Sequence, residues 1–446
     1  MRKYRRVVRE NGSFLQGYQI FLIALLGILM LIFGLNLIHV LLSDLGLNVI
    51  KIFRLANIFL WICALISSVL FLIFYFSREK VSTINLPEMN KKARKKSKKI
   101  RRLFSDKVVA DILGLAVKTR YGVEMPEVAV FLENDLYSGF IAVENIGNYD
   151  VLNHSEMEQK VSGILSGKWQ KYAVTSSELI RGDTYVLYRF EDCQTSMRLI
   201  IKRSDEIADF VSSDKHELRL AKDLVWHCDK VPHLAIIART RAGKSVFAGA
   251  YLAPLMIMQG WKVEYNSAKS DIYVKKYRGK SEPTEIVERA EYWVSKMEGR
   301  LRLINKAGAE KYTDMPNMVD IAVFFDELGN LNASLEHDKK LKTRWEMAIN
   351  RLSATGASAG LHIISISQRA TREGFLTGLA RTNSSDAVIM LGGAASSPSE
   401  RQYLIPGFEI PTRSYGVGQG IAKVDGSGKR WETPHYYETP LFKHYV

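Results

Sequence analysis

The chain has 446 residues and a formal net charge of +15. This length exceeds what one hydrophobic core supports, so we expect two or more folded units. Residues 1–102 hold 18 Lys and Arg against 4 Asp and Glu, a net of +14, which leaves only +1 for the rest. The near-neutral charge of residues 103–446 argues against a surface that binds DNA over its whole extent. DNA contact by that part must come from a local patch or a pore lining.

Two long apolar runs lie near the start of the chain. Residues 18–42 and 55–76 are nearly uncharged, and each is long enough to cross a bilayer as a helix. The alternative is a pair of buried helices in a soluble protein. Globular helices seldom run so far without a polar face, so we predict two transmembrane helices.

Basic residues flank both apolar runs. Five lie in residues 1–17 and eleven lie in residues 78–102, whereas the connecting loop holds two. This asymmetry predicts that both ends face the cytoplasm, with residues 77–103 as a basic linker. The densest stretch, residues 91–102, is expected to contact anionic membrane lipids, at about 1 kcal/mol for each charge. The alternative is a collar that guides DNA.

The three cysteines carry little information. Cys63 lies inside an apolar run, while Cys193 and Cys228 stand singly, without the paired spacing of a metal site. We therefore expect no zinc and a reducing compartment.

Residues 104–215 form the next segment, in which short β-rich pieces appear. Strands are expected at 128–132 and 185–190, and a helix is expected near 155–165. The pattern predicts a small α+β domain. It contains no recognisable chemical motif, so its function stays open.

From residue 216 onward, apolar strands alternate with helical stretches. The expected strands are 234–237, 262–265, 321–325, 362–366 and 387–391. This alternation predicts a mainly parallel sheet flanked by helices, an α/β domain over residues 216–446. The glycine-rich residues 416–428 are expected to form a late hairpin.

A phosphate-binding loop is predicted at residues 238–245, which read ARTRAGKS. An expected strand precedes it and a helical stretch follows, as such a loop requires. Lys244 can reach the β and γ oxygens of ATP, and the Ser245 hydroxyl can ligate Mg²⁺. The expected nucleotide-binding residues are Thr240, Arg241, Ala242, Gly243, Lys244 and Ser245.

Ala238 departs from the glycine that usually begins this motif. Glycine allows backbone angles that a β-carbon disfavours, so a distorted loop is one expectation. Alanine adds only a methyl group, and loss of nucleotide binding is not implied.

Two carboxylates follow the expected strand 321–325. A parallel sheet places Asp326 and Glu327 at its carboxyl edge, beside the phosphate-binding loop, which is the Walker B pattern. Asp326 can hold the Mg²⁺ shell, and Glu327 can polarise the attacking water. An acidic helix start is the alternative, and it does not explain the upstream loop.

Gln368 follows the expected strand 362–366, which places its amide at the same sheet edge. It is a plausible sensor of the γ-phosphate. A glutamine after a strand is usually only a loop residue; its position as the third element in order favours the functional interpretation.

The order and the sequences of these motifs resemble those of the FtsK/SpoIIIE-type DNA-pumping ATPases, including TcpA-like coupling proteins of Gram-positive conjugative elements. The resemblance covers about residues 216–435 and depends on residues 231–238, 325–327 and 359–369. It implies a RecA-like motor that assembles as a hexameric ring around DNA, with ATP at subunit interfaces.

The resemblance also implies an arginine that acts in trans, for which Arg351, Arg381 and Arg401 are candidates. Besides Ala238, two departures from the family pattern limit it. Residues 267–269 read SAK where the family has Asp-Pro-Lys, and residues 356–360 lack a common arginine. The sequence ends near the last expected strands, so we expect no module that reads DNA-orienting sequences.

The first functional hypothesis is a membrane-anchored, ATP-driven DNA translocase. It would act as the coupling protein that delivers DNA, with a bound relaxase, to conjugation channel proteins. The alternatives are a chromosome-segregation translocase, a protein-secretion ATPase and a membrane scaffold without hydrolysis.

Overall fold

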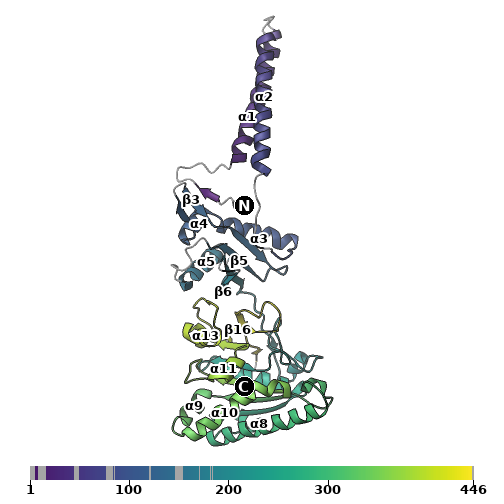
Figure 1. Ribbon diagram of the computed structural model, residues 1–446, viewed down its shortest axis with the longest axis vertical. Helices are drawn as coiled ribbons and strands as arrows, with labels where there is room; N and C mark the ends of the chain where they lie inside the picture. The colour runs from purple at the N-terminus through teal and green to yellow at the C-terminus, as the bar shows by residue number, and fades with distance from the viewer. Residues whose placement is uncertain are drawn as a thin grey trace. The chain divides into compact units, whose positions relative to one another are not determined.

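The computed structural model describes residues 6–8, 17–44, 50–76, 84, 86–119, 122–145, 154–169, 171–180, 182 and 184–443 (Figure 1). The chain divides into two compact units. The first combines residues 1–89, 95–131 and 143–150, and the second combines 90–94, 132–142 and 151–446.

Two long apolar helices dominate the first unit. They are α1 (Gly17–Asp44) and α2 (Ile50–Phe76), and both are long and apolar enough to cross a membrane. Only 6% and 11% of their most apolar stretches are buried, which a core helix of a soluble protein would not show. The Asn57 amide donates to Asn36 at 2.5 Å and joins the two helices. The prediction of two long apolar helices is confirmed.

The first unit also contains a small sheet that the sequence did not indicate. Its strands are β1 (Arg6–Val8), β2 (Val117–Thr119) and β3 (Gly122–Met125), in the order β1-β3-β2. β1 pairs antiparallel with β3, so residues on either side of the apolar helix pair share one sheet.

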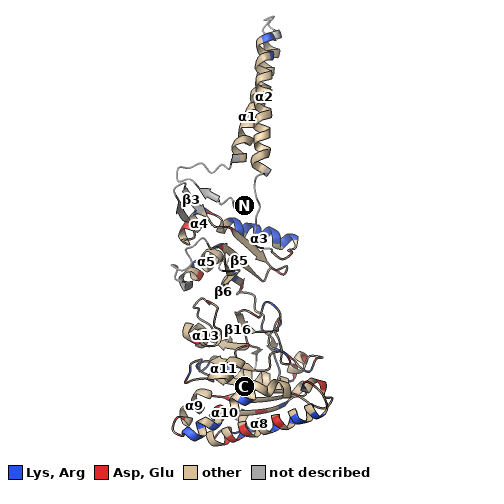
Figure 2. Cartoon of the chain, viewed as in Figure 1, with Lys and Arg blue, Asp and Glu red and all other residues tan. Residues whose placement is uncertain are grey.

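The remaining described elements of this part of the chain are α3 (Lys91–Phe104), α4 (Lys107–Ile112) and β4 (Val128–Leu132). β4 has the bounds predicted from the sequence. Lys and Arg residues, coloured blue in Figure 2, occupy most positions of α3.

The second unit begins with an α+β portion. Its elements are β5 (Ser138–Glu144), α5 (His154–Lys168), β6 (Tyr172–Ile180) and β7 (Tyr185–Asp192). These strands belong to a four-stranded sheet in the order β4-β5-β7-β6, in which β6 pairs antiparallel with β7. The expected helix and the expected strand at 185–190 are both present. The predicted boundary at residue 216 falls inside this unit and stays a prediction.

A seven-stranded sheet forms the body of the second unit, in the order β12-β13-β14-β11-β15-β16-β17. The strands are β11 (Leu234–Ala238), β12 (Lys262–Ser267), β13 (Ile321–Asp326), β14 (Leu361–Ser367), β15 (Ala387–Leu391), β16 (Gln419–Val424) and β17 (His435–Glu438). The first five are parallel, and β16 and β17 add the late antiparallel hairpin that the sequence predicted.

Helices cover both faces of this sheet. They are η3 (Val246–Leu252), α6 (Ala253–Met258), α7 (Ile272–Lys276), α8 (Pro283–Lys306), α9 (Leu328–Leu335), α10 (Lys339–Ala359), α11 (Gly378–Asn383), α12 (Gly393–Ser396) and α13 (Pro398–Leu404). Successive β11 side chains alternate between two buried cores: Ile236 packs with η3, and Ile237 packs with α8 and α10. The strands are apolar on both faces, which explains why they read as continuous apolar runs.

Short elements complete the unit: β8 (Ile200–Ile201), η2 (Ser204–Phe210), β9 (Glu217–Arg219), β10 (Val225–His227), η4 (Tyr312–Asp314) and β18 (Leu441–Phe442). η3 has the wider hydrogen-bond spacing of a π-helix where a plain α-helix was expected. Such segments often lie at functional sites.

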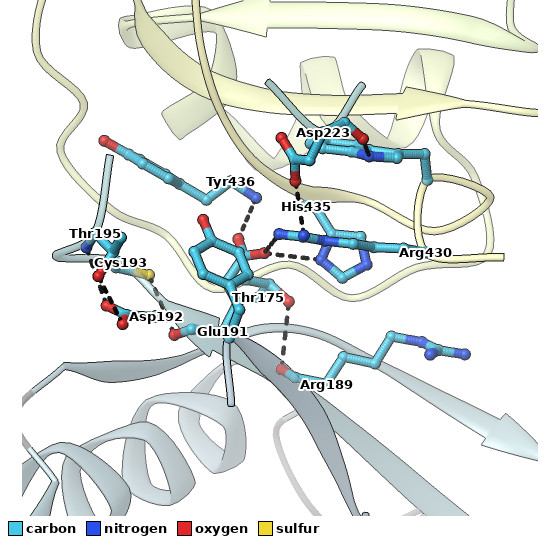
Figure 3. Close-up of polar contacts among 12 residues, drawn as sticks. Thr175, Arg189, Glu191, Asp192, Cys193, Thr195, Asp223, Arg430, His435 and Tyr436 are labelled. Carbon is cyan, nitrogen blue, oxygen red and sulfur yellow. Dashed lines mark hydrogen bonds and ion pairs between the residues drawn. The ribbon is translucent and has the colours of Figure 1, made fainter. Parts of the chain in front are cut away.

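A buried charge network joins β7 to the end of the large sheet (Figure 3). The fully buried Glu191 carboxylate faces Arg430 at 3.1 Å and His435 at 3.0 Å, and the Tyr436 amide donates to it at 2.5 Å. Arg430 also pairs with Asp223 at 2.7 Å. Burial alone would raise the pKa of Glu191, but His435 and Arg430 outweigh it and hold that pKa below its ordinary value. The carboxylate therefore stays charged and connects the α+β portion to the large sheet.

Candidate functional site

The predicted phosphate-binding loop leaves the centre of the large sheet. β11 ends at Ala238, which is fully buried and lies opposite Leu391 of β15. The turn itself uses left-handed backbone at Arg241, with φ of 66°, and at Gly243, with φ of 97°. Ala238 has strand geometry and needs no positive φ. Its methyl group therefore requires no strained backbone in this structure, and its effect on nucleotide binding stays a prediction.

The segment before β16 covers this loop. The Gly418 amide donates to the Ala242 carbonyl at 2.9 Å, and the Gly392 amide donates to Gln419 at 2.9 Å. A β-carbon on Gly392 would lie 2.9 Å from the Ala242 methyl carbon. Glycine at 392 thus permits the end of β15 to approach the loop closely.

Lys244 is buried against both Walker B carboxylates. Its ammonium lies 2.7 Å from Glu327 and 3.0 Å from Asp326, and its side chain is 8% exposed. Burial alone would lower the pKa of Lys244, but the two carboxylates outweigh it and hold the pKa above its ordinary value. The lysine therefore remains charged and neutralises part of the acidic pair.

Gln368 connects the other two motifs. Its amide nitrogen donates to Glu327 at 2.9 Å, and its amide oxygen accepts from the Thr240 hydroxyl at 3.2 Å. A continuous chain of polar contacts therefore runs from Thr240 through Gln368 and Glu327 to Lys244. These residues come from the ends of β11, β13 and β14, which are parallel neighbours in the sheet.

The acidic pair is held by its own backbone and by one tyrosine. The Asp326 carboxylate accepts from the Tyr265 hydroxyl at 2.8 Å and from the Glu327 amide at 2.7 Å. Burial raises the pKa of Asp326. Glu327 has left-handed backbone, with φ of 56°, a strained conformation that directs its side chain toward Gln368 and Lys244.

An open cavity of about 880 Å³ lies beside these side chains. Arg239, Thr240, Glu327, Gln368 and Arg369 line it together with residues of α9. It is large enough for a phosphate-bearing ligand and leaves this edge of the sheet accessible from outside.

The sequence did not reveal two further supports of the site. Glu400 pairs with Arg239 of the loop and accepts from the Ala370 amide at 3.1 Å, so it ties the loop to the segment after Gln368. Tyr265 positions Asp326 from the neighbouring strand. Both residues are remote in sequence from the motifs that they support, and neither stands in a recognisable pattern.

The three arginine candidates differ in their surroundings. Arg401 is buried and donates to the backbone oxygens of Ala395 at 2.8 Å and Ile410 at 2.5 Å, so it supports its own subunit. Arg351 pairs with Glu298 at an exposed position, and Arg381 stacks on a tyrosine ring at 4.7 Å. Only the last two present a guanidinium near the surface.

A second polar cluster lies at the opposite edge of the sheet. His216, Cys228 and Asp320 bring one ligand-type atom each within 4.8 Å of one another, a grouping that their sequence spacing did not indicate. The Asp320 carboxylate already accepts from the Tyr312 hydroxyl at 2.5 Å and lies 2.9 Å from the His362 ring nitrogen. Burial raises the pKa of the Cys228 thiol. Hydrogen bonds thus account for this cluster.

Comparison with known proteins gives a fold but no sequence family. No family model matches the sequence, and no curated protein matches it. The chain is similar to the solved pCW3 conjugation coupling protein TcpA, in its monomer form with ATPγS. The identity is 15% and the TM-score 0.50, over 77% of this chain and 96% of that chain.

Two further ATPase structures also match over shorter regions, one of which is a Type VII secretion ATPase. EssC from Geobacillus thermodenitrificans (ATPases 2 and 3) is 14% identical with a TM-score of 0.41, over 55% of this chain and 47% of that chain. The cytoplasmic domain of EccC from Thermomonospora curvata is 15% identical with a TM-score of 0.41, over 54% and 30%. The mixed α/β architecture with its mostly parallel seven-stranded sheet is thus the fold of the coupling protein TcpA, and the resemblance stated from the motifs is confirmed as a likeness of fold.

Proposed function

We propose that the chain is a membrane-anchored, ATP-driven DNA translocase that acts as the coupling protein in conjugative transfer of a plasmid or integrative element. The observation that carries this proposal is the contact chain from Thr240 through Gln368 and Glu327 to Lys244. It brings three nucleotide motifs to one sheet edge, in a fold that a conjugation coupling protein shares. The role in conjugation is proposed from this similarity of fold.

The residues present fit ATP with Mg²⁺. Loop amides from Arg241 to Ser245 and the Lys244 ammonium suit phosphate oxygens. The exposed Ser245 hydroxyl and the Asp326 carboxylate supply the oxygen ligands that Mg²⁺ prefers. When bound, ATP supplies the phosphoanhydride whose hydrolysis drives movement.

Hydrolysis requires an oriented water molecule, and Glu327 is the residue that we assign to polarise it. Gln368 already holds one oxygen of this carboxylate at 2.9 Å and is near enough to the loop to contact a γ-phosphate. When Lys244 moves to phosphate oxygens, the Glu327 carboxylate loses this ion pair and becomes available to a water molecule.

We infer that six copies assemble around DNA, with an arginine of one copy completing the site of the next. Arg351 and Arg381 remain candidates for that arginine. Arg401 does not suit the role because its guanidinium serves its own backbone. A relaxase and the channel proteins of the transfer apparatus are the further partners of this proposal.

We also infer a membrane anchor with both ends in the cytoplasm. α1 and α2 supply the two spans, and the basic residues on both flanks favour the cytoplasmic side. The pairing of β1 with β3 supports this topology, because strands that pair across the helix hairpin must lie on one side of a membrane.

The deciding experiment measures ATP hydrolysis by the full chain in lipid nanodiscs, with and without DNA, next to Lys244→Ala. Stimulation by DNA, abolished by Lys244→Ala, supports the translocase. Hydrolysis indifferent to DNA would favour the secretion ATPase. Absence of hydrolysis under both conditions would favour a scaffold and contradict the proposal.

A further inference from the structure

The helix α3 carries an unusual concentration of positive charge. Nine of its 14 residues are Lys or Arg. Eight of the nine are exposed: Lys91, Lys92, Arg94, Lys95, Lys98, Lys99, Arg101 and Arg102. None of these eight has an acidic partner within the described part of the chain. We call their shared surface the basic face. Figure 2 colours the basic residues of α3 blue.

The opposite side of α3 is buried in the protein. Ala93 and Ile100 are 0% exposed and Phe104 is 1% exposed. The Ser97 hydroxyl donates to the Val130 carbonyl of β4 at 2.5 Å. These contacts fix the rotation of the helix about its axis, so the basic face points away from the fold.

The basic face is broad as well as charged. At 100° per residue, its eight side chains cover about 180° of the helix circumference, and the helix is about 21 Å long. Like charges at this density repel one another, and an anionic surface relieves that repulsion.

The basic face also lies close in sequence to the apolar helices. α2 ends at Phe76 and α3 begins at Lys91, so the intervening chain spans at most about 50 Å. If α2 spans a membrane, this tether keeps the basic face near the headgroups at all times, which raises their effective concentration.

We propose that the basic face of α3 docks on anionic lipid headgroups through charge alone. The inference rests on the membrane anchor proposed above and goes beyond the motor function. An interfacial helix normally inserts its apolar side into the bilayer, but that side of α3 is already buried in the fold. The face contains only Lys and Arg and offers no aromatic ring on which a nucleobase could stack, so lipid suits it better than single-stranded DNA.

The test is lysine footprinting of the full chain in nanodiscs. The acetylation rate of each lysine is measured by mass spectrometry in discs of phosphatidylcholine and in discs that also contain phosphatidylglycerol. The lysines of the basic face should react at least about fivefold more slowly in the anionic discs at low salt, and high salt should remove this protection. Lys339 and Lys340, exposed on α10, are internal controls that should not change.

A charge-reversal variant makes the test specific. Lys95→Glu, Lys98→Glu and Arg102→Glu together reverse the centre of the basic face, and Lys91, Lys92 and Lys99 should then lose their protection. The matched control, Lys339→Glu with Lys340→Glu, should leave it intact. A melting temperature like that of the wild type excludes misfolding, since all three residues are exposed.

Three results would overturn the inference. Equal rates in neutral and anionic discs would exclude headgroup docking. Protection that persists at high salt would indicate apolar insertion instead. Protection by added DNA but not by anionic lipid would assign the face to nucleic acid. A chain that does not enter the discs at all contradicts the anchor itself, which separates failure of that proposal from failure of this one.

Discussion

The ammonium of Lys244 lies 2.7 Å from the carboxylate of Glu327. The cation expected to bind phosphate therefore neutralises the carboxylate expected to polarise water. Nucleotide must exchange one partner of Lys244 for another, so the affinity for ATP reflects a competition between phosphate oxygens and Glu327. The same exchange would couple nucleotide binding to release of the Glu327 carboxylate, the proposed base.

This relationship predicts the behaviour of Glu327→Gln. Removal of the charge weakens the competitor for Lys244, so ATP should bind at least as tightly as in the wild type. Turnover should fall by about 10²- to 10⁴-fold, because the polarising carboxylate is lost. Equilibrium binding and steady-state hydrolysis measure the two effects. Glu336→Gln, at an exposed carboxylate in the same cavity, is the matched control. Wild-type turnover in Glu327→Gln would show that Glu327 does not polarise the attacking water.

Ala238→Gly restores the glycine that usually begins the phosphate-binding motif, yet we expect no gain in nucleotide affinity. Ala238 lies in the β11 ladder, and the turn uses Arg241 and Gly243 instead. Glycine in a strand interior costs about 0.5–1 kcal/mol, so the melting temperature should fall slightly. Isothermal titration with ATPγS and thermal melting provide the check. A marked rise in affinity would show that the alanine does distort the loop.

Glu158 should make stability depend on pH. Its side chain is fully buried, one oxygen contacts the Ser177 hydroxyl, and burial raises its pKa from 4.5 to about 7. A raised pKa favours the protonated form in the fold. Protonated Glu158 therefore stabilises the fold fully below pH 4.5. This stabilisation declines as the pH rises and is lost above pH 7, which lowers the free energy of unfolding by about 3 kcal/mol.

Glu158→Gln keeps the shape and removes the titration. Its melting temperature should therefore decline less than that of the wild type between pH 5 and pH 7, and at pH 8 the variant should be the more stable protein. Glu310→Gln, at an exposed carboxylate, should follow the wild type. Parallel curves for Glu158→Gln and the wild type would contradict the assignment.

Glu191→Gln should destabilise the second unit. The change removes the buried charge that faces Arg430 and His435, and among the described residues it leaves Asp223 as the acidic partner of Arg430. Loss of one member of a buried ion network costs about 3 kcal/mol, which urea unfolding can measure. The comparison variant is Glu178→Gln, whose pair with Arg189 is partly exposed and worth about 1 kcal/mol or less. Equal losses in the two variants would argue against the buried network.

The large sheet was predictable because its strands are apolar on both faces and alternate with helices. β15 has the bounds expected from the sequence, and Asp326 ends β13 as the motif required. The three motifs also reach one edge because parallel neighbours end together. Their contacts were not predictable: which partner Lys244 takes depends on side-chain rotamers and on the strained backbone of Glu327.

Other features could not be predicted from the sequence because they depend on packing between distant segments. Arg401 stands among surface-type residues in the sequence, yet the fold turns its guanidinium inward to two carbonyl groups. Tyr265 reads as an ordinary strand residue, and only the pairing of β12 with β13 brings its hydroxyl to Asp326. β1 is three residues long and begins with an arginine, too short for a periodic signal.

If α1 and α2 form the proposed membrane anchor, the pairing of β1 with β3 imposes an order on synthesis and insertion. The ribosome releases Arg6–Val8 first, but the partner strand follows only after both apolar helices have emerged. The small sheet can close only when the helix hairpin has returned the chain to the side from which it started. If α2 fails to insert in the proposed anchor, β3 stays on the opposite side of the membrane from β1, so closure of this sheet would report that the proposed helix hairpin has formed.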